Sequence, residues 1–118
     1  MDNDDGLSKL SAAIAEFAEQ RDWDQFHNPK NLAMALAAEA GEILDHFQWL
    51  SQSEADSLGA TQRHEVVMEM ADVLMFLLRL ADKLQVDLLK AAEEKLELNR
   101  HRYPVEKVRG RATKYDKL

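Results

Sequence analysis

The segment Arg63–Leu84, RHEVVMEMADVLMFLLRLADKL, is the most apolar part of the chain and decides its fold. At about 100° per residue, its hydrophobic side chains cover most of the circumference of a helix. They are Val66, Val67, Met70, Ala71, Val73, Leu74, Leu77, Leu78 and Ala81. A helix that is apolar on nearly every side has to be enclosed by other helices. The segment therefore predicts the central helix of an all-α protein.

Three further helices are predicted around this central one. Apolar residues recur at helical spacing from Leu7 to Phe17, which indicates the first helix. Asn28 and Pro29 start the second, because Asn accepts hydrogen bonds from free N–H groups and Pro lacks a donor that would be unpaired there. Asp87 offers the same kind of cap to the last helix. We expect helices over residues 7–21, 29–50, 63–84 and 88–102.

These helices predict a single domain over residues 1–118, built as a four-helix bundle. A chain of this length has no room for a second hydrophobic core. Residues 1–6 and the basic stretch 105–118 show no clear period, and we expect them to be flexible or arm-like ends. The longest internal loop is expected over the small, polar residues 51–62.

The composition excludes several classes of protein. The chain has no cysteine, which removes disulfides, thiolate zinc sites and thiol catalysis. Its formal net charge of −7 disfavours binding to nucleic acid and to anionic lipid. It contains no apolar run of membrane-spanning length and no signal segment. We therefore expect a cytoplasmic protein with neither a membrane nor a nucleic acid as partner.

Two pairs of acidic residues carry the chemical prediction. Glu39 and Glu42 lie three residues apart in the second predicted helix, and Glu69 and Asp72 repeat this spacing in the third. Each pair therefore occupies one face of its helix. Nearly everything else on the third helix is apolar, so its acidic face is expected to meet another helix. If the two helices pack side by side, the four carboxylates converge.

The spacing alone is not specific, because Glu16 and Glu19 share it. The alternative is that both acidic stripes are solvated faces of amphipathic helices, as most rows of charge are. Two features favour convergence: the scarcity of polar surface on the third helix, and Trp49 on the acidic side of the second. A buried carboxylate without a partner would carry a large desolvation cost, which a metal ion removes.

Four converging oxygen donors indicate Mg²⁺ or Mn²⁺ and phosphoryl chemistry. The sequence has no Gly-rich phosphate loop and no dinucleotide fingerprint, which excludes P-loop and Rossmann mechanisms. A di-iron carboxylate bundle requires Glu-x-x-His on two helices, and no glutamate of this chain has that spacing to a histidine. The residues by themselves thus favour a metal-dependent reaction of a phosphorylated substrate.

The acidic pairs and their flanking segments resemble the MazG-type all-α nucleoside triphosphate pyrophosphohydrolases, and within them the dCTP pyrophosphatase-like branch. The segments that carry the resemblance are RDWDQFH at 21–27, Asn31-Leu32, EAGE at 39–42, FQW at 47–49, EMAD at 69–72 and RYPV at 102–105. The resemblance implies hydrolysis of a (deoxy)nucleoside triphosphate, dCTP or a modified dCTP, to the monophosphate and pyrophosphate. Such house-cleaning enzymes remove surplus or modified nucleotides.

The resemblance also implies roles for individual residues. Glu39, Glu42, Glu69 and Asp72 are the implied catalytic residues and the ligands of Mg²⁺, with Mn²⁺ as a substitute. The implied substrate-binding residues are Trp23, His27 and Trp49 around the base, Lys95 and Asn99 at the phosphates or sugar, and also Phe76 and Tyr103. Since this branch usually forms homotetramers, the implied assembly is a homo-oligomer, a tetramer or a dimer.

Phe76 departs from the pattern, because a tyrosine is expected at this position. Without that hydroxyl the preference for base and sugar stays open, and dUTP or phosphoribosyl-ATP are alternative substrates. The residues alone also leave ordinary structural roles open. Trp23 could belong to the core, His27 could cap or pack, and Lys95 and Asn99 could be solvated. A helical interaction module without activity is the third alternative.

Overall fold

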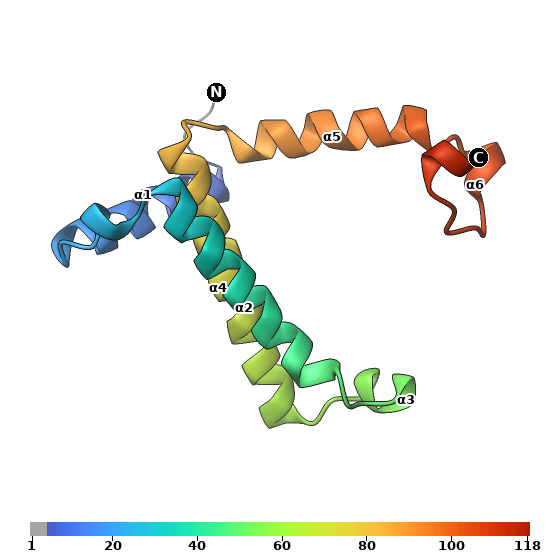
Figure 1. Cartoon of the computed structure of the whole chain (residues 1–118), viewed down its shortest axis with the longest axis horizontal. Coiled ribbons are helices and arrows are strands. Elements are labelled where there is room, and N and C mark those ends of the chain that lie inside the picture. The colour runs from blue at the N-terminus through green and yellow to red at the C-terminus, as the bar shows by residue number, and fades with distance from the viewer. Residues whose placement is uncertain (1–4) are drawn as a thin grey trace. The chain divides into compact units, whose positions relative to one another are not determined.

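The structure is a computed structural model that describes residues 5–118. Its helices (Figure 1) are α1 (Gly6–Gln20), η1 (Asp24–Phe26), α2 (Pro29–Phe47), α3 (Gln52–Ala55), α4 (Ala60–Lys83), α5 (Leu88–Arg102), α6 (Val105–Val108) and η2 (Tyr115–Lys117). No strand occurs among these residues, so the predicted all-α class with four long helices is confirmed. Within residues 5–118, no helix combines the length and the apolar character needed to cross a membrane.

The chain divides into two compact units, of which the first ends at Val86 and the second is Asp87–Leu118. In the first unit, α4 contacts both α1 and α2, and α2 runs beside it (Figure 1). The apolar segment 63–84 therefore lies in the helix against which both α1 and α2 pack, as the sequence predicts. The second unit contains α5, α6 and η2, and in it the Tyr103 and Tyr115 rings meet edge-on at 6.0 Å. A single domain over the whole chain stays a prediction.

Side-chain caps begin three of the long helices. The Asn28 carboxamide accepts a hydrogen bond from the Asn31 N–H at 2.9 Å, and Pro29 is the first helical residue. Asp87 accepts from the Lys90 N–H at 3.1 Å. Both predicted caps are confirmed. Asp5 caps α1, which thus begins inside the segment expected to be a flexible end, while residues 1–4 of that segment lie outside the described residues.

The prediction of one continuous loop over 51–62 is wrong. The short helix α3 forms there, and α4 begins at Ala60 rather than Arg63. Ser51 and Glu54 make a reciprocal capping box, in which each side chain accepts from the backbone N–H of the other residue. This Ser-x-x-Glu signal is local and was readable from the sequence.

The ends of α1 and α4 share a left-handed turn that fixes the direction of the following segment. Asp22 and Gln85 have φ values of 55° and 57°, which few residues other than glycine adopt. After α1, the Trp23 N–H donates to the Ala18 carbonyl at 2.9 Å, and the Asp22 N–H donates to Glu19 at 3.0 Å. This is the Schellman pattern. It places Trp23 directly after the helix and ahead of η1.

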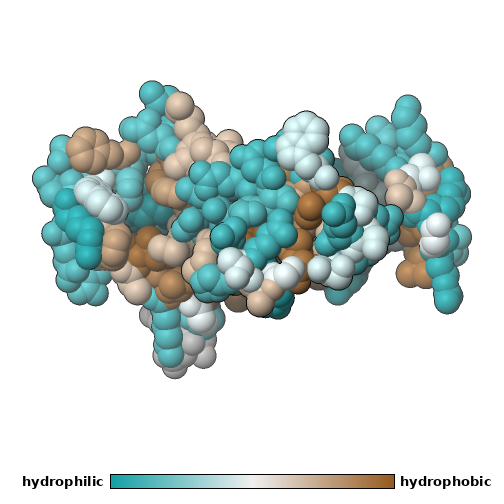
Figure 2. Space-filling model, turned by 90° about the horizontal axis from the view of Figure 1, so that it is seen from below, coloured by the Kyte–Doolittle hydropathy of each residue, from teal (hydrophilic) through white to brown (hydrophobic). Residues whose placement is uncertain are grey.

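The buried core is small, so much of the apolar surface of the first unit stays uncovered. The buried hydrophobic residues are Ala18, Leu32, Val66, Leu78 and Ala81. Figure 2 shows hydrophobic side chains at the surface between polar ones. On α2 and α4 the exposed large hydrophobic residues are Met34, Leu44, Val67, Met68, Met70, Leu74 and Met75. A monomeric protein rarely leaves so many apolar side chains of neighbouring helices in water.

Candidate metal and nucleotide site

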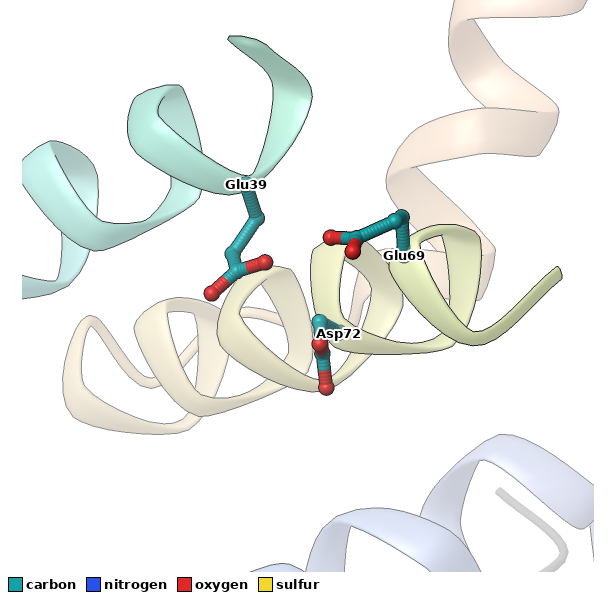
Figure 3. A group of neighbouring side chains, drawn as sticks. All are labelled: Glu39, Glu69 and Asp72. Carbon is teal, nitrogen blue, oxygen red and sulfur yellow. The ribbon is translucent and has the colours of Figure 1, made fainter. Parts of the chain in front are cut away.

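Three carboxylates meet where α2 packs against α4. Glu39 extends from α2 towards α4, and Glu69 and Asp72 extend from successive turns of α4 (Figure 3). One oxygen from each of the three lies within 4.8 Å of the others. Ligand oxygens on opposite sides of one octahedral Mg²⁺ are about 4 Å apart. Small side-chain rotations therefore suffice for the three acids to share a divalent ion.

Two of these carboxylates are incompletely satisfied. Glu39 Oε2 and Glu69 Oε2 are both buried, and neither has a hydrogen-bond partner among the described residues. A buried acceptor without a partner costs about 1–3 kcal/mol, and more when it is charged. A cation at this point would supply the missing partner. The donor set, which consists of carboxylate oxygens alone, suits a hard divalent metal such as Mg²⁺ or Mn²⁺.

Proton affinity shows how closely the acids interact. Hydrogen bonding with Glu42 is the main factor that raises the pKa of Glu69 to about 7, followed by burial and by repulsion from the Glu42 and Glu39 carboxylates. Burial raises the pKa of Glu39, and the Glu42 charge raises it further. Without a cation, this cluster therefore takes up protons near neutral pH instead of carrying its full negative charge.

Glu42 lies apart from the tight group of the other three predicted acids. Its side chain is exposed, and it is not among the three whose oxygens converge within 4.8 Å. Its effect on the pKa values of Glu39 and Glu69 nevertheless shows that it borders the cluster. The structure thus groups Glu39, Glu69 and Asp72 tightly and leaves Glu42 at the rim.

The aromatic residues predicted to hold a base, Trp23, Trp49 and Phe76, all lie in the first unit, but their side chains differ in exposure. Trp23 is 46% exposed and packs edge-on against Phe17, with ring centroids 5.7 Å apart. Trp49 is 86% exposed and follows the end of α2. Phe76 is half-buried on α4, one turn after Asp72. Trp49 is therefore hardly covered by residues 5–118, whereas Trp23 has an aromatic partner in α1.

An ionic cluster around the buried Arg79 joins η1 to the end of α4, and sequence reasoning missed it. Arg79 pairs with Asp24 and with Asp82, and its Nε donates to His27 Nδ1 at 3.1 Å. Lys83 binds the same oxygen of Asp24 at 2.5 Å. Arg79 is only 4% exposed. The sequence did carry one signal for this cluster, namely Arg79 within the most apolar predicted helix. A cation buried there requires acidic partners.

Lys95, Asn99 and Tyr103 belong to the second unit, so the prediction that they contact the substrate stays a prediction. Lys95 is exposed and Asn99 partly so, and they lie one turn apart on α5. The Tyr103 N–H donates to the Asn99 carbonyl at 2.8 Å and ends the helix. The cation of Arg102 lies over the Tyr115 ring, 4.4 Å from its centroid.

Comparison with known proteins gives a consistent result. The model of the MazG-like family matches residues 34–118. The dCTP pyrophosphatase 1 of Rattus norvegicus is 45% identical over 114 residues, which are 95% of this chain and 67% of the relative. The Homo sapiens protein of the same name is 42% identical over the same shares.

Solved structures extend the likeness to the fold. A pyrophosphatase from Archaeoglobus fulgidus DSM 4304 superposes with a TM-score of 0.80 at 34% sequence identity, covering 88% of this chain and 97% of that one. The family match includes Glu39, Glu42, Glu69 and Asp72. Sequence, fold and the carboxylate cluster between α2 and α4 lead to one conclusion: this chain belongs to the MazG-like family.

Proposed function

We propose that this protein is a Mg²⁺-dependent pyrophosphohydrolase that converts dCTP, or a modified dCTP, to the monophosphate and pyrophosphate. The observation that carries the proposal is the cluster of Glu39, Glu69 and Asp72, with two buried oxygens that lack a partner. The similarity to proteins named dCTP pyrophosphatase 1 supports the choice of substrate. Removal of surplus or modified nucleotides from the pool is the corresponding cellular role.

The carboxylates supply the part of the site that handles the phosphates. Glu39, Glu69 and Asp72 would hold Mg²⁺, with Glu42 at the rim as a fourth carboxylate. A metal held there would neutralise charge on the phosphate oxygens and lower the pKa of water. The acids themselves are held in place by two packed helices, which limits the reorganisation required on substrate binding. For the phosphates or the sugar, the resemblance to the family also points to Lys95 and Asn99, which belong to the second unit.

The base is held by aromatic stacking and selected by hydrogen bonds. Trp23 and Trp49 are both exposed, and stacking of a base on an aromatic ring contributes about 1–3 kcal/mol. Stacking is nearly indifferent to the identity of the base, so selection requires hydrogen bonds to the base edge. His27, which ends η1 four residues after Trp23, is the side chain that would make one. Phe76 completes the proposed base site in the first unit, and the resemblance to the family adds Tyr103 of the second unit as a proposed substrate contact.

The decisive experiment is a panel of nucleoside triphosphates incubated with the protein and Mg²⁺, with pyrophosphate measured as the product. We expect release from dCTP or a modified dCTP at a higher kcat/KM than from dUTP, dTTP or purine triphosphates. Chelation of the metal should abolish it, and Mn²⁺ should restore it. Faster turnover of dUTP or phosphoribosyl-ATP would replace the proposed substrate. No turnover of any triphosphate, together with no Mn²⁺ binding in calorimetry, would contradict the enzymatic proposal.

We also propose that the working form is a homo-oligomer, a tetramer or a dimer, in which partner subunits cover the exposed apolar side chains of α4. Val67, Met70 and Leu74 recur at helical spacing and are all exposed in the single chain. Closed symmetric association would bury them. Met70→Glu places a charge in this surface. We expect the variant to sediment as a smaller species than the wild type in analytical ultracentrifugation.

The matched control is Arg63→Glu, which adds a glutamate to an exposed polar position of the same helix. It should sediment as the wild type does, since no apolar surface is altered. A wild-type protein that sediments as a monomer at micromolar concentration would rule out the assembly. An equal change in the sedimentation coefficient of both variants would show that the apolar surface of α4 is not the interface.

A further inference from the structure

Arg79 is the one buried charged residue among residues 5–118, and each arm of its guanidinium has a partner. Its Nη1 donates to Asp82 Oδ2 at 2.9 Å, and its Nη2 pairs with Asp24. Its Nε donates to Nδ1 of His27 at 3.1 Å. Two carboxylates balance its charge, with Lys83 as a second cation on Asp24. Among the described residues, no ion pair or hydrogen bond joins this cluster to the carboxylates of the metal site, so charge balance there does not explain it.

The bond from Arg79 fixes the protonation of the His27 ring. Because Nδ1 accepts a hydrogen bond, its lone pair is in use and the single proton of the neutral imidazole lies on Nε2. Burial lowers the pKa of His27, and the positive charge of Arg79 lowers it further. The other charged groups that face the ring are Lys83 on α4, which lowers this pKa, and Asp24 in η1, which raises it. The ring is therefore neutral at pH 7, with one defined donor.

We propose that Arg79 is a positioning residue for substrate selection: it holds His27 as a fixed Nε2–H donor for the edge of the bound base. The inference rests on the proposed function, in which His27 contacts the base. A donor at this point favours a base with an acceptor on the facing edge, such as the 2-carbonyl oxygen of a pyrimidine. Arg79 itself contacts no substrate and acts through the imidazole.

An arginine is required for this task because of its shape. The guanidinium offers five N–H donors in a rigid plane, which lets one side chain bind His27, Asp24 and Asp82 together. A lysine keeps the charge, but it has a single ammonium group on a flexible stem. Arg79→Lys is therefore a variant that preserves an ion pair with the acids and the fold, while it gives up the directed bond to His27.

The first test observes the imidazole directly. Long-range ¹H–¹⁵N spectra distinguish the two ring nitrogens of each histidine, and His27→Ala identifies the signals of His27 among those of His46, His64 and His101. At pH 7 we expect the wild-type His27 proton on Nε2. In Arg79→Lys we expect a mixture of both tautomers. A wild-type proton on Nδ1, or an unchanged tautomer in Arg79→Lys, would overturn the inference.

The second test asks whether Arg79 acts through His27. With dCTP and Mg²⁺, Arg79→Lys should raise KM about tenfold, equivalent to about 1.4 kcal/mol, and change kcat less than twofold. In a His27→Ala background the same substitution should change KM less than twofold, since coupled residues are not additive. Equal increases in both backgrounds would indicate a merely structural role and overturn the proposal.

The control is Arg63→Lys, an exposed arginine at the other end of α4, which should match the wild type in both tests. The two proposals fail in different ways. Absence of dCTP hydrolysis by the wild type would contradict the proposed function and, with it, the role of His27 at the base. The spectra would then still decide whether Arg79 fixes the tautomer.

Discussion

Glu39→Gln should lower kcat for pyrophosphate release from dCTP by about a thousandfold and leave the protein folded. The substitution keeps the size of the side chain and removes one anionic oxygen from the cluster with Glu69 and Asp72. Metal-mediated charge stabilisation contributes several kcal/mol to a transition state, and each 1.4 kcal/mol or so is a tenfold change in rate. Asp72→Asn should act in the same way.

Two measurements separate this effect from unfolding. Circular dichroism should show unchanged helical content, and the melting temperature without metal should not fall, because the substitution removes a carboxylate whose pKa burial raises. Glu16→Gln is the matched control, since Glu16 is exposed on α1 and belongs to a pair with the same three-residue spacing. It should retain full activity. Full turnover in Glu39→Gln would contradict the assignment of the carboxylates.

The second large effect concerns stability, pH and metal. The native pKa of Glu69 is about 7 and its ordinary value is 4.5, so the native state binds more protons than the unfolded state between these values. The contribution of Glu69 to the free energy of unfolding is therefore complete below about pH 4.5, and it is lost as the pH rises through 7. The contribution of Glu39 changes in the same direction. In the presence of EDTA, we expect the melting temperature to fall between pH 5 and pH 8.

Millimolar Mg²⁺ or Mn²⁺ should reverse this loss, and its effect should be larger at pH 8 than at pH 5, because metal and protons compete for the same oxygens. Glu69→Gln stays neutral throughout and should melt with a flatter pH dependence and a smaller response to metal. Glu65→Gln, an exposed glutamate one turn earlier on α4, should behave as the wild type. Equal metal effects at both pH values would show that the carboxylates do not bind the ion.

The helices could be predicted because their signals are local. Asn28 and Asp87 cap helices as expected, and the apolar period of residues 63–84 identifies the helix against which the others pack. The helix α3 was not predicted, although Ser51 and Glu54 have the Ser-x-x-Glu spacing of its capping box. Apolar periodicity was the criterion for a helix, and a four-residue helix is too short to show one.

The residues of the candidate site could be named from spacing and resemblance, but their distances could not. Spacing places Glu69 and Asp72 on one face of a helix and does not choose the neighbour of that face. The structure places Glu39 beside them and Glu42 at the rim. The contrast between Trp23, which packs on Phe17, and Trp49, which is exposed, also depends on packing.

The sequence by itself determined an all-α chain, its helix caps and two acidic stripes, because helix formation depends on residues within a few positions of one another. The tertiary structure alone decided which stripes meet. It joined Glu39 to Glu69 across thirty positions, and it joined Arg79 to His27 and Asp24 across 52 and 55. Such contacts follow from how two helices pack, and packing is set by shape and burial over the whole unit rather than by the spacing within either helix.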